Sequence, residues 1–187
     1  MALSINDLKN GVTIDLEGVP YLIIDAQHVK PGKGSAIARI KAKNLKSGAL
    51  IERTYRGNES IQEAFIDEKK LQYLYHQDDL YHFMDQNNFE ELTVTKDQLK
   101  DQIKFLKDNL ECNGYFFKEV LVNIALPNFI ILKVVHTEPG IKGDTAKNTT
   151  KLAELDTGAT IQVPLFVNQG DNLKIDTRTG SYVERAV

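Results

Sequence analysis

The stretch HVKPGKGSAIARIKAK, residues 28–43, contains a tight turn followed by a strongly patterned segment. From residue 36 onward the chain alternates strictly between two sets of positions, which are Ala36, Ala38, Ile40 and Ala42 in one set and Ile37, Arg39, Lys41 and Lys43 in the other. Successive side chains of a β-strand point to opposite faces. The pattern therefore predicts a strand with an apolar inward face and a basic outward face.

The turn before this strand presents a single lysine. Pro31 fixes its own φ and favours an extended Lys30, while Gly32 and Gly34 allow backbone angles that other residues avoid. Lys33 lies between the two glycines, so no neighbouring side chain limits how closely a partner can approach its ammonium group. By itself the turn has a simpler explanation, because Pro-Gly pairs mark hairpin turns with solvated residues far more often than functional sites.

Basic residues are concentrated around this turn. Between His28 and Arg56 the sequence contains eight basic residues and one acidic residue, Glu52, which gives this segment a net charge of +7, although the whole chain carries −3. Divided near residues 64 and 127, the three parts of the chain carry +2, −5 and 0. This segregation predicts a polyanionic partner that is contacted at limited places.

The composition is that of an ordinary globular chain. Its 187 residues are 42% hydrophobic and 26% charged, enough for one domain or for two or three small ones. There is no apolar run of membrane-spanning length and no basic-then-apolar leader, so we expect a cytoplasmic protein without a membrane partner. The single cysteine, Cys112, excludes an intramolecular disulfide and a cysteine-based metal site.

A cluster at 76–82 raises the question of a metal. It contains His76, Asp78, Asp79 and His82. Turns favour Asp, and a half-buried strand tolerates His, so a plain hairpin explains these residues better than a metal site does. We expect neither a metal nor a cofactor.

Short strands separated by turn residues recur along the chain. Strands are predicted at 12–16, 19–24, 36–43, 49–55, 71–76, 80–84, 120–124, 129–135, 160–167, 173–177 and 180–183. Domain boundaries are expected near 60–66 and 126–128. One segment has a helical period, with apolar residues at 99, 103, 106 and 110. The spacing of the strands predicts small β-barrels.

Several separated motifs resemble bacterial translation elongation factor P. They are residues 28–34, 43–48 and 72–75 and, in the C-terminal third, residues 138–140, 142–145, 155–159, 163–166 and 176–180. Motifs that occur in the same order over the whole chain are much more specific than any one of them. The resemblance implies an all-β chain of three small barrels in an elongated, tRNA-like arrangement. These are a KOW or SH3-like domain over 1–64 and OB-fold domains over 65–127 and 128–187. It also implies that the helical segment near 96–110 is short.

The resemblance carries functional implications. It implies a translation elongation factor that binds the 70S ribosome beside the peptidyl-tRNA and relieves stalling at consecutive prolines. Lys33 would lie near the CCA end of that tRNA. In many family members this lysine is extended covalently, so a lysine-modifying enzyme is an implied partner. The factor is expected to be a monomer that assists catalysis by the ribosome and is not itself an enzyme.

Three further groups of residues are candidates for RNA contacts. The phosphates along the tRNA acceptor side are expected to contact Arg39, Lys41, Lys43, Arg53 and Arg56. For any one of these residues, a charged strand face exposed to solvent is an equally good explanation. The loop containing Gly143, Asp144 and Thr145 resembles the family loop near the exit-site codon. Near the C-terminus, Tyr182 and Arg185 either stack on and pair with RNA or simply end a barrel strand.

Two other functions compete with this interpretation. A ribosome- or RNA-binding paralogue with a different role is expected to lack the modifiable lysine, yet Lys33 is present. An enzyme that uses Lys33 as nucleophile or base requires its pKa to be lowered by burial or by nearby positive charge. In a glycine-flanked turn the Lys33 ammonium is expected to be exposed instead, and this disfavours an enzymatic function.

Overall fold

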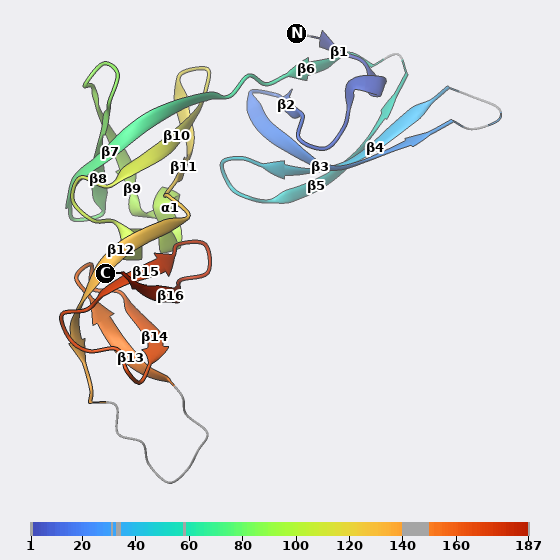
Figure 1. Ribbon diagram of the computed structural model, residues 1–187. Helices are drawn as coiled ribbons and strands as arrows, with labels where there is room; N and C mark the ends of the chain where they lie inside the picture. Colours follow the sequence, from blue (N-terminus) through green and yellow to red (C-terminus); the bar gives the residue numbers. More distant parts are fainter. Residues whose placement is uncertain (1, 31, 33–34, 58, 140–149, 187) are drawn as a thin grey trace. The chain divides into compact units, whose positions relative to one another are not determined.

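The computed structural model describes residues 2–30, 32, 35–57, 59–139 and 150–186, and it consists of three curled sheets (Figure 1). The predicted all-β fold is confirmed. By their contacts the residues divide into two compact units. The first contains Met1–Lys69 and Gly114–Ile124, and the second contains Lys70–Asn113 and Ala125–Val187.

The first sheet has six strands, and each pairs antiparallel with its neighbours. Their spatial order is β1 (Ala2–Leu3), β6 (Ile61–Glu63), β2 (Thr13–Leu16), β3 (Val19–Val29), β4 (Ile37–Asn44) and β5 (Leu50–Arg56). The predicted turn between β2 and β3 is present. There Gly18 takes a positive φ of 83°, and its N–H donates to the Asp15 carboxylate at 2.7 Å.

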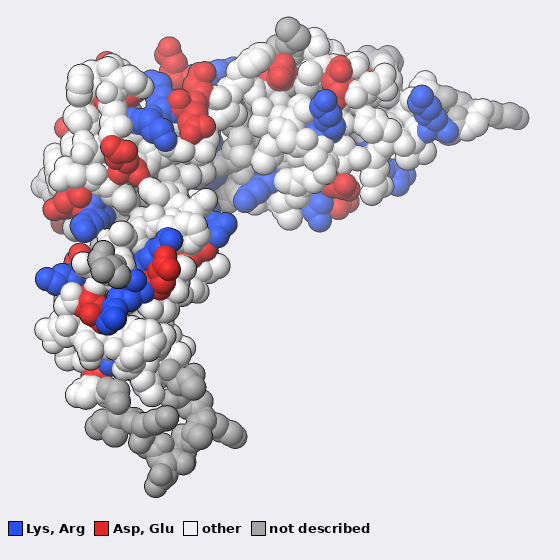
Figure 2. All heavy atoms as spheres, in the orientation of Figure 1, with Lys and Arg blue, Asp and Glu red and all other residues white. Residues whose placement is uncertain are grey.

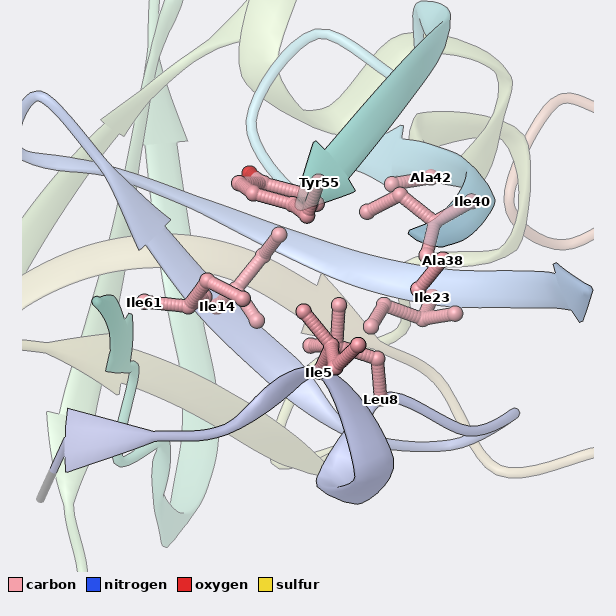
Figure 3. Close-up of a cluster of buried hydrophobic side chains, with 9 residues drawn as sticks. All are labelled: Ile5, Leu8, Ile14, Ile23, Ala38, Ile40, Ala42, Tyr55 and Ile61. Atoms are coloured by element: carbon pink, nitrogen blue, oxygen red, sulfur yellow. The ribbon is translucent and has the colours of Figure 1, made fainter. Parts of the chain in front are cut away.

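The inward face of this sheet forms the core of the first unit. Figure 3 shows side chains from five strands and from the N-terminal 3₁₀ segment (Ile5–Asp7) converging on one cluster. Its buried members are Ile5, Leu8, Ile14, Ile23, Ala38, Ile40, Ala42, Tyr55 and Ile61. Ala38, Ile40 and Ala42 are the residues that the alternation of β4 predicts to be inward, and all three are buried. The two-faced character of β4 is confirmed.

The second sheet has five strands. Their order is β11 (Val120–Ala125), β10 (Glu111–Phe117), β7 (Asp67–Gln77), β8 (Leu80–Asp85) and β9 (Glu91–Thr95). The predicted hairpin between β7 and β8 is present, with Asp78 at a positive φ of 53°. In the first unit, Phe117 and Val122 of β10 and β11 pack with Ala64 in a second small core. An ion pair of 2.8 Å between Lys118 Nζ and Asp15 Oδ2 lies in the same unit.

The segment with the helical period forms only a short helix. The helix α1 (Lys96–Leu99) is followed directly by a 3₁₀ segment (Lys100–Phe105). Lys100 has a positive φ of 53°, which a continuing α-helix does not allow. Leu99, Phe105 and Leu106 are buried, so the apolar period of this segment reflects the packing of a compact turn and not a long helix.

The third sheet lies entirely in the second unit and is antiparallel throughout. Its order is β14 (Thr160–Pro164), β13 (Thr150–Leu155), β12 (Phe129–Thr137), β15 (Asn172–Asp176) and β16 (Ser181–Ala186). Leu132, Leu155, Leu173 and Ile175 are buried on its inner side. The turn after β15 is fixed by Arg178, whose Nε and Nη2 donate to the two oxygens of Asp176 at 3.0 and 2.6 Å.

Helices are minor elements in this fold. In the described part of the chain, none is long or apolar enough to cross a membrane.

The two faces of β4 differ in what they contribute to stability. Replacing the buried Ile40 with Ala removes packed methyl groups and leaves a cavity, so we expect the first unit to lose about 2 to 5 kcal/mol of unfolding free energy. The matched variant Lys43→Ala, on the exposed face of the same strand, should change stability by less than about 0.5 kcal/mol. Urea unfolding followed by circular dichroism measures both. Equal losses would contradict the assigned faces.

The ion pair between Asp176 and Arg178 makes stability sensitive to acid. Hydrogen bonds from the Arg178 side chain lower the pKa of the Asp176 carboxyl to about 2. As the pH falls, Asp176 is therefore protonated in the unfolded chain before it is protonated in the folded chain. The stabilisation from the ion pair is present above about pH 4 and is lost as the pH falls from about 4 to about 2. In Asp176→Asn we expect a lower melting temperature at pH 7 and a smaller fall between pH 4 and pH 2. A melting series over pH 2 to 7 tests this, and identical acid profiles would contradict it.

Candidate functional site

The hairpin of β3 and β4 carries the lysine turn. The paired strands end at Val29 and Ile37, so the turn extends from residue 30 to residue 36. Lys30, Gly32 and Ser35 are exposed. Pro31, Lys33 and Gly34 lie outside the described residues, so the role of Lys33 stays a prediction.

The outward face of β4 begins directly beyond this turn. Arg39 and Lys43 are exposed, whereas Lys41 between them is half-buried. The three cations share the face because they occupy alternate positions of one strand. What surrounds each cation depends on the neighbouring strands.

A β-bulge in β3 decides the neighbours on one side. Ile23 pairs with Ala42 and Asp25 pairs with Lys41, which leaves Ile24 as the extra residue. Beyond the bulge, the side chains of β3 point to the opposite faces from those that an unbroken alternation would give. Asp25 is thereby placed opposite Lys41, and Gln27 opposite Arg39. Sequence reasoning missed Asp25, which precedes the segment of high positive charge. The interruption of alternation at Leu22-Ile23-Ile24 is the only local signal of the bulge.

The edge strand β5 supplies the neighbours on the other side. Glu52 lies opposite Lys41, and Thr54 lies opposite Arg39. Arg56, opposite Ile37, joins the outward face near the turn. Among the predicted contact residues, the structure thus brings together Arg39, Lys41, Lys43 and Arg56 on one face. Asp25 and Glu52 share this face and reduce its net charge to +2.

Arg53 belongs to the other side of β5. It lies opposite the buried Ile40, and its guanidinium carbon lies 5.4 Å from the ring centre of Tyr55. Tyr55 is buried, and its hydroxyl has no hydrogen-bond partner among the described residues. This burial raises the pKa of Tyr55. Arg53 is therefore exposed at the rim of the core, on the other side of β5 from Thr54, although it also lines the depression beside Arg39.

The outward face is hollowed between the three strands. A depression of about 410 Å³ is lined by Asp25, Gln27, Arg39, Ile40, Lys41, Glu52, Arg53 and Thr54. Gln27 Nε2 donates to Asp25 Oδ2 at 3.4 Å. Figure 2 shows basic and acidic side chains together on the part of the molecule where Figure 1 draws these strands. The hollow can hold an anionic group beside a guanidinium and neutral hydrogen-bond donors.

A second β-bulge arranges the candidate residues near the C-terminus. Tyr182 lies opposite Ile175 and Arg185 lies opposite Leu173, and the extra residue between them is Val183. Because Leu173 and Ile175 are two apart on one strand, the bulge brings Tyr182 and Arg185 to the same face. Arg185 Nη1 lies 3.7 Å from Asp171 Oδ2. Gly143, Asp144 and Thr145 lie outside the described residues.

The two histidines of the 76–82 cluster have structural partners. His82 Nδ1 lies 2.5 Å from Glu91 Oε1 and its ring stacks on Tyr75, while His76 Nδ1 lies 3.1 Å from the Tyr73 hydroxyl. Within the described ranges, no group of three or more His, Cys, Asp or Glu side chains is placed to hold a metal ion. Burial raises the pKa of the Cys112 thiol to about 12, which keeps it protonated at neutral pH.

Comparison with known families and relatives covers almost the whole chain. Residues 4–61 match the elongation factor P KOW-like domain, residues 66–124 the elongation factor P OB domain, and residues 130–185 the elongation factor P C-terminal domain. Elongation factor P of Moorella thermoacetica is 52% identical over 184 residues, which are 98% of this chain and 100% of the relative. Elongation factor P of Clostridioides difficile is 50% identical over 183 residues, 98% of this chain and 99% of the relative.

A solved structure is similar in fold. Eukaryotic translation initiation factor 5A from Methanococcus jannaschii matches with a TM-score of 0.56 and 24% identity, over 66% of this chain and 93% of that one. At this identity the likeness concerns the fold alone. The three family matches and the relatives of about half identity show that the chain belongs to the elongation factor P family and is a translation elongation factor.

Proposed function

We propose that this translation elongation factor binds the ribosome beside the peptidyl-tRNA and stimulates peptide-bond formation at consecutive prolines. The observation that carries the proposal is the hairpin of β3 and β4, which joins the Lys33 turn directly to the basic face of β4. A turn that reaches towards the reacting ends of the tRNA substrates needs a nearby surface that binds the nucleic acid, and the basic face of β4 is such a surface. The chain's membership of the elongation factor P family supports the same conclusion.

The physical task is positioning. Proline is conformationally restricted, so the reactive ends of the two tRNA substrates are poorly aligned. Correct alignment recovers a large part of a reaction barrier without any new chemical group. The factor therefore acts on ribosomal catalysis by holding the peptidyl-tRNA, and it performs no chemical step of its own.

Lys33 supplies the contact nearest to the reaction. The neighbouring glycines leave its ammonium accessible, both to the CCA end and to an enzyme that extends the side chain. A longer side chain with added hydrogen-bonding groups reaches further along the tRNA backbone. We assign Lys33 as the substrate of a lysine-modifying enzyme.

The rest of the chain provides two separate RNA contacts. The first is the outward face of β4, through Arg39, Lys43 and Arg56. Lys41 shares this face, and Arg53 lines the depression beside Arg39. The second combines the loop of Gly143, Asp144 and Thr145 with Tyr182 and Arg185, near the exit-site codon. The protein acts as a monomer of three domains, 1–64, 65–127 and 128–187. The ranges of the three matching family models support this division.

A reconstituted translation assay tests the function. Natively purified protein is compared with Lys33→Ala and with buffer on a triple-proline message and on a proline-free message. We expect only the native protein to accelerate the triple-proline message, by about tenfold or more, because alignment is lost with the lysine. Circular dichroism should show that Lys33→Ala keeps its fold.

Two controls sharpen this assay. The variant Lys9→Ala removes an exposed lysine of the first unit far from the turn in sequence, and it should rescue like the native protein. Mass spectrometry of the peptide containing Lys33 shows whether a group has been added. Unchanged rescue by Lys33→Ala would contradict the role of the turn. No rescue by native protein, even after treatment with a modifying enzyme, would favour the RNA-binding paralogue.

A further inference from the structure

The cations on the outward face of β4 have very different surroundings. Lys41 lies between two acids, Asp25 on β3 and Glu52 on β5. Arg39 lies between two neutral hydrogen-bonding residues, Gln27 and Thr54, in the adjacent row. The sequence suggests a uniform basic stripe, whereas the register divides it into rows of different charge.

We propose that the row of Gln27, Arg39 and Thr54 is a phosphate-binding subsite, and that the row of Asp25, Lys41 and Glu52, with a net charge of −1, excludes a phosphate. The inference rests on the proposed function and specifies how its first RNA contact is made. The ligand is one phosphate group of an RNA backbone. Gln27 and Thr54 are thereby added to the contact residues, and Lys41 is removed from them.

The chemistry of the first row suits a phosphate. Phosphate oxygens in protein–nucleic acid complexes accept hydrogen bonds from Arg and also from Thr and Gln side chains. Arg39 supplies a planar set of N–H donors, and the Thr54 hydroxyl and Gln27 amide flank it across the strands. All three residues line the depression of about 410 Å³, whose lining also includes Asp25, Lys41 and Glu52 of the adjacent row. A phosphate in the hollow can meet a charged donor and neutral donors together.

The second row is unsuited to a phosphate. Cross-strand neighbours have Cβ atoms about 4.5 to 5.5 Å apart, so Lys41 is within reach of a carboxylate on each side. Lys41 is also half-buried, whereas Arg39 is exposed. A phosphate that approaches Lys41 meets two carboxylates at similar range, and repulsion offsets the attraction. The β-bulge at Ile24 is essential, because without it Asp25 would face the core side.

Lys43 has no acid in its row. Its neighbours across the strands are Leu22 and Leu50. Arg39 and Lys43 are four residues apart, which is about 13 Å along a strand. Along β4 the face therefore offers two phosphate contacts, Arg39 and Lys43, separated by an excluded row. Such spacing fixes the register of an RNA backbone more tightly than a continuous basic stripe does.

Binding of the full-length protein to ribosomes that carry peptidyl-tRNA, measured over a series of KCl concentrations, tests this division. For Arg39→Ala we expect about tenfold weaker binding, and a slope of log affinity against log salt reduced by about 0.7 to 0.9, because one phosphate contact is lost. Thr54→Val should weaken binding about threefold with an unchanged slope, because only a neutral donor is lost. Lys41→Ala should bind within about twofold of the native protein with an unchanged slope.

Neutralising the acids provides the complementary test. In the double variant Asp25→Asn, Glu52→Gln, Lys41 becomes available, so binding should tighten severalfold and the salt slope should steepen by about 0.7 to 0.9. The control Asp67→Asn, Glu68→Gln removes two exposed acids of the same unit outside this face and should leave the slope unchanged. Melting curves verify that each variant is folded.

The outcomes separate the two proposals. Equal losses of affinity and slope in Lys41→Ala and Arg39→Ala, with normal binding by the native protein, would overturn the division into rows and leave the proposed function intact. An acid double variant that behaves like its control would do the same. Absence of native binding at every salt concentration would overturn the proposed function together with this subsite.

Discussion

Burial of alternate side chains of β4 is the constraint on which the first unit depends. Ala38, Ile40 and Ala42 are held in the core by packing from the neighbouring strands and from the N-terminal 3₁₀ segment. A slip of β4 by one residue would bring Ile37, Arg39 and Lys41 into the core, and burial of unpaired cations is prohibitively unfavourable. Hydrophobic packing on one side therefore fixes the positions of charges on the other.

Much of this architecture can be predicted from local pattern. The alternation of β4, the turn at Glu17-Gly18 and the hairpin between β7 and β8 each depend on residues close in sequence, and each is confirmed. The strands β1, β6, β9, β10 and β13 are not among those predicted. Phe116 and Phe117 of β10 are both buried, so the end of that strand lacks a simple alternation. In the segment after residue 95 the apolar period indicates a longer helix than forms, and the family resemblance correctly implies a short one.

The candidate site shows where local reasoning ends. The shared face of Arg39, Lys41 and Lys43 can be predicted from the alternation of one strand. The presence of Asp25 on that face, and the position of Arg53 on the other side, depend on the pairing among three strands. The bulges at Ile24 and Val183 are each an extra residue relative to a partner strand, so the pairing fixes their positions, and the interrupted alternation at Leu22-Ile23-Ile24 is the only local signal of the first one. Charge counted along the sequence therefore overstates the charge available on the folded surface.

The buried sulfur of Cys112 has a practical consequence for labelling. It is the only cysteine of the chain, it is packed against the backbone of Leu71, and its thiolate form is suppressed at neutral pH. Maleimides and disulfide reagents react with exposed thiolates, so the native chain should be nearly unreactive towards them. A cysteine introduced at an exposed position becomes the single attachment point for a fluorophore or spin label. A pair of such cysteines would then allow distances within this protein to be measured by spectroscopy without first removing its own cysteine.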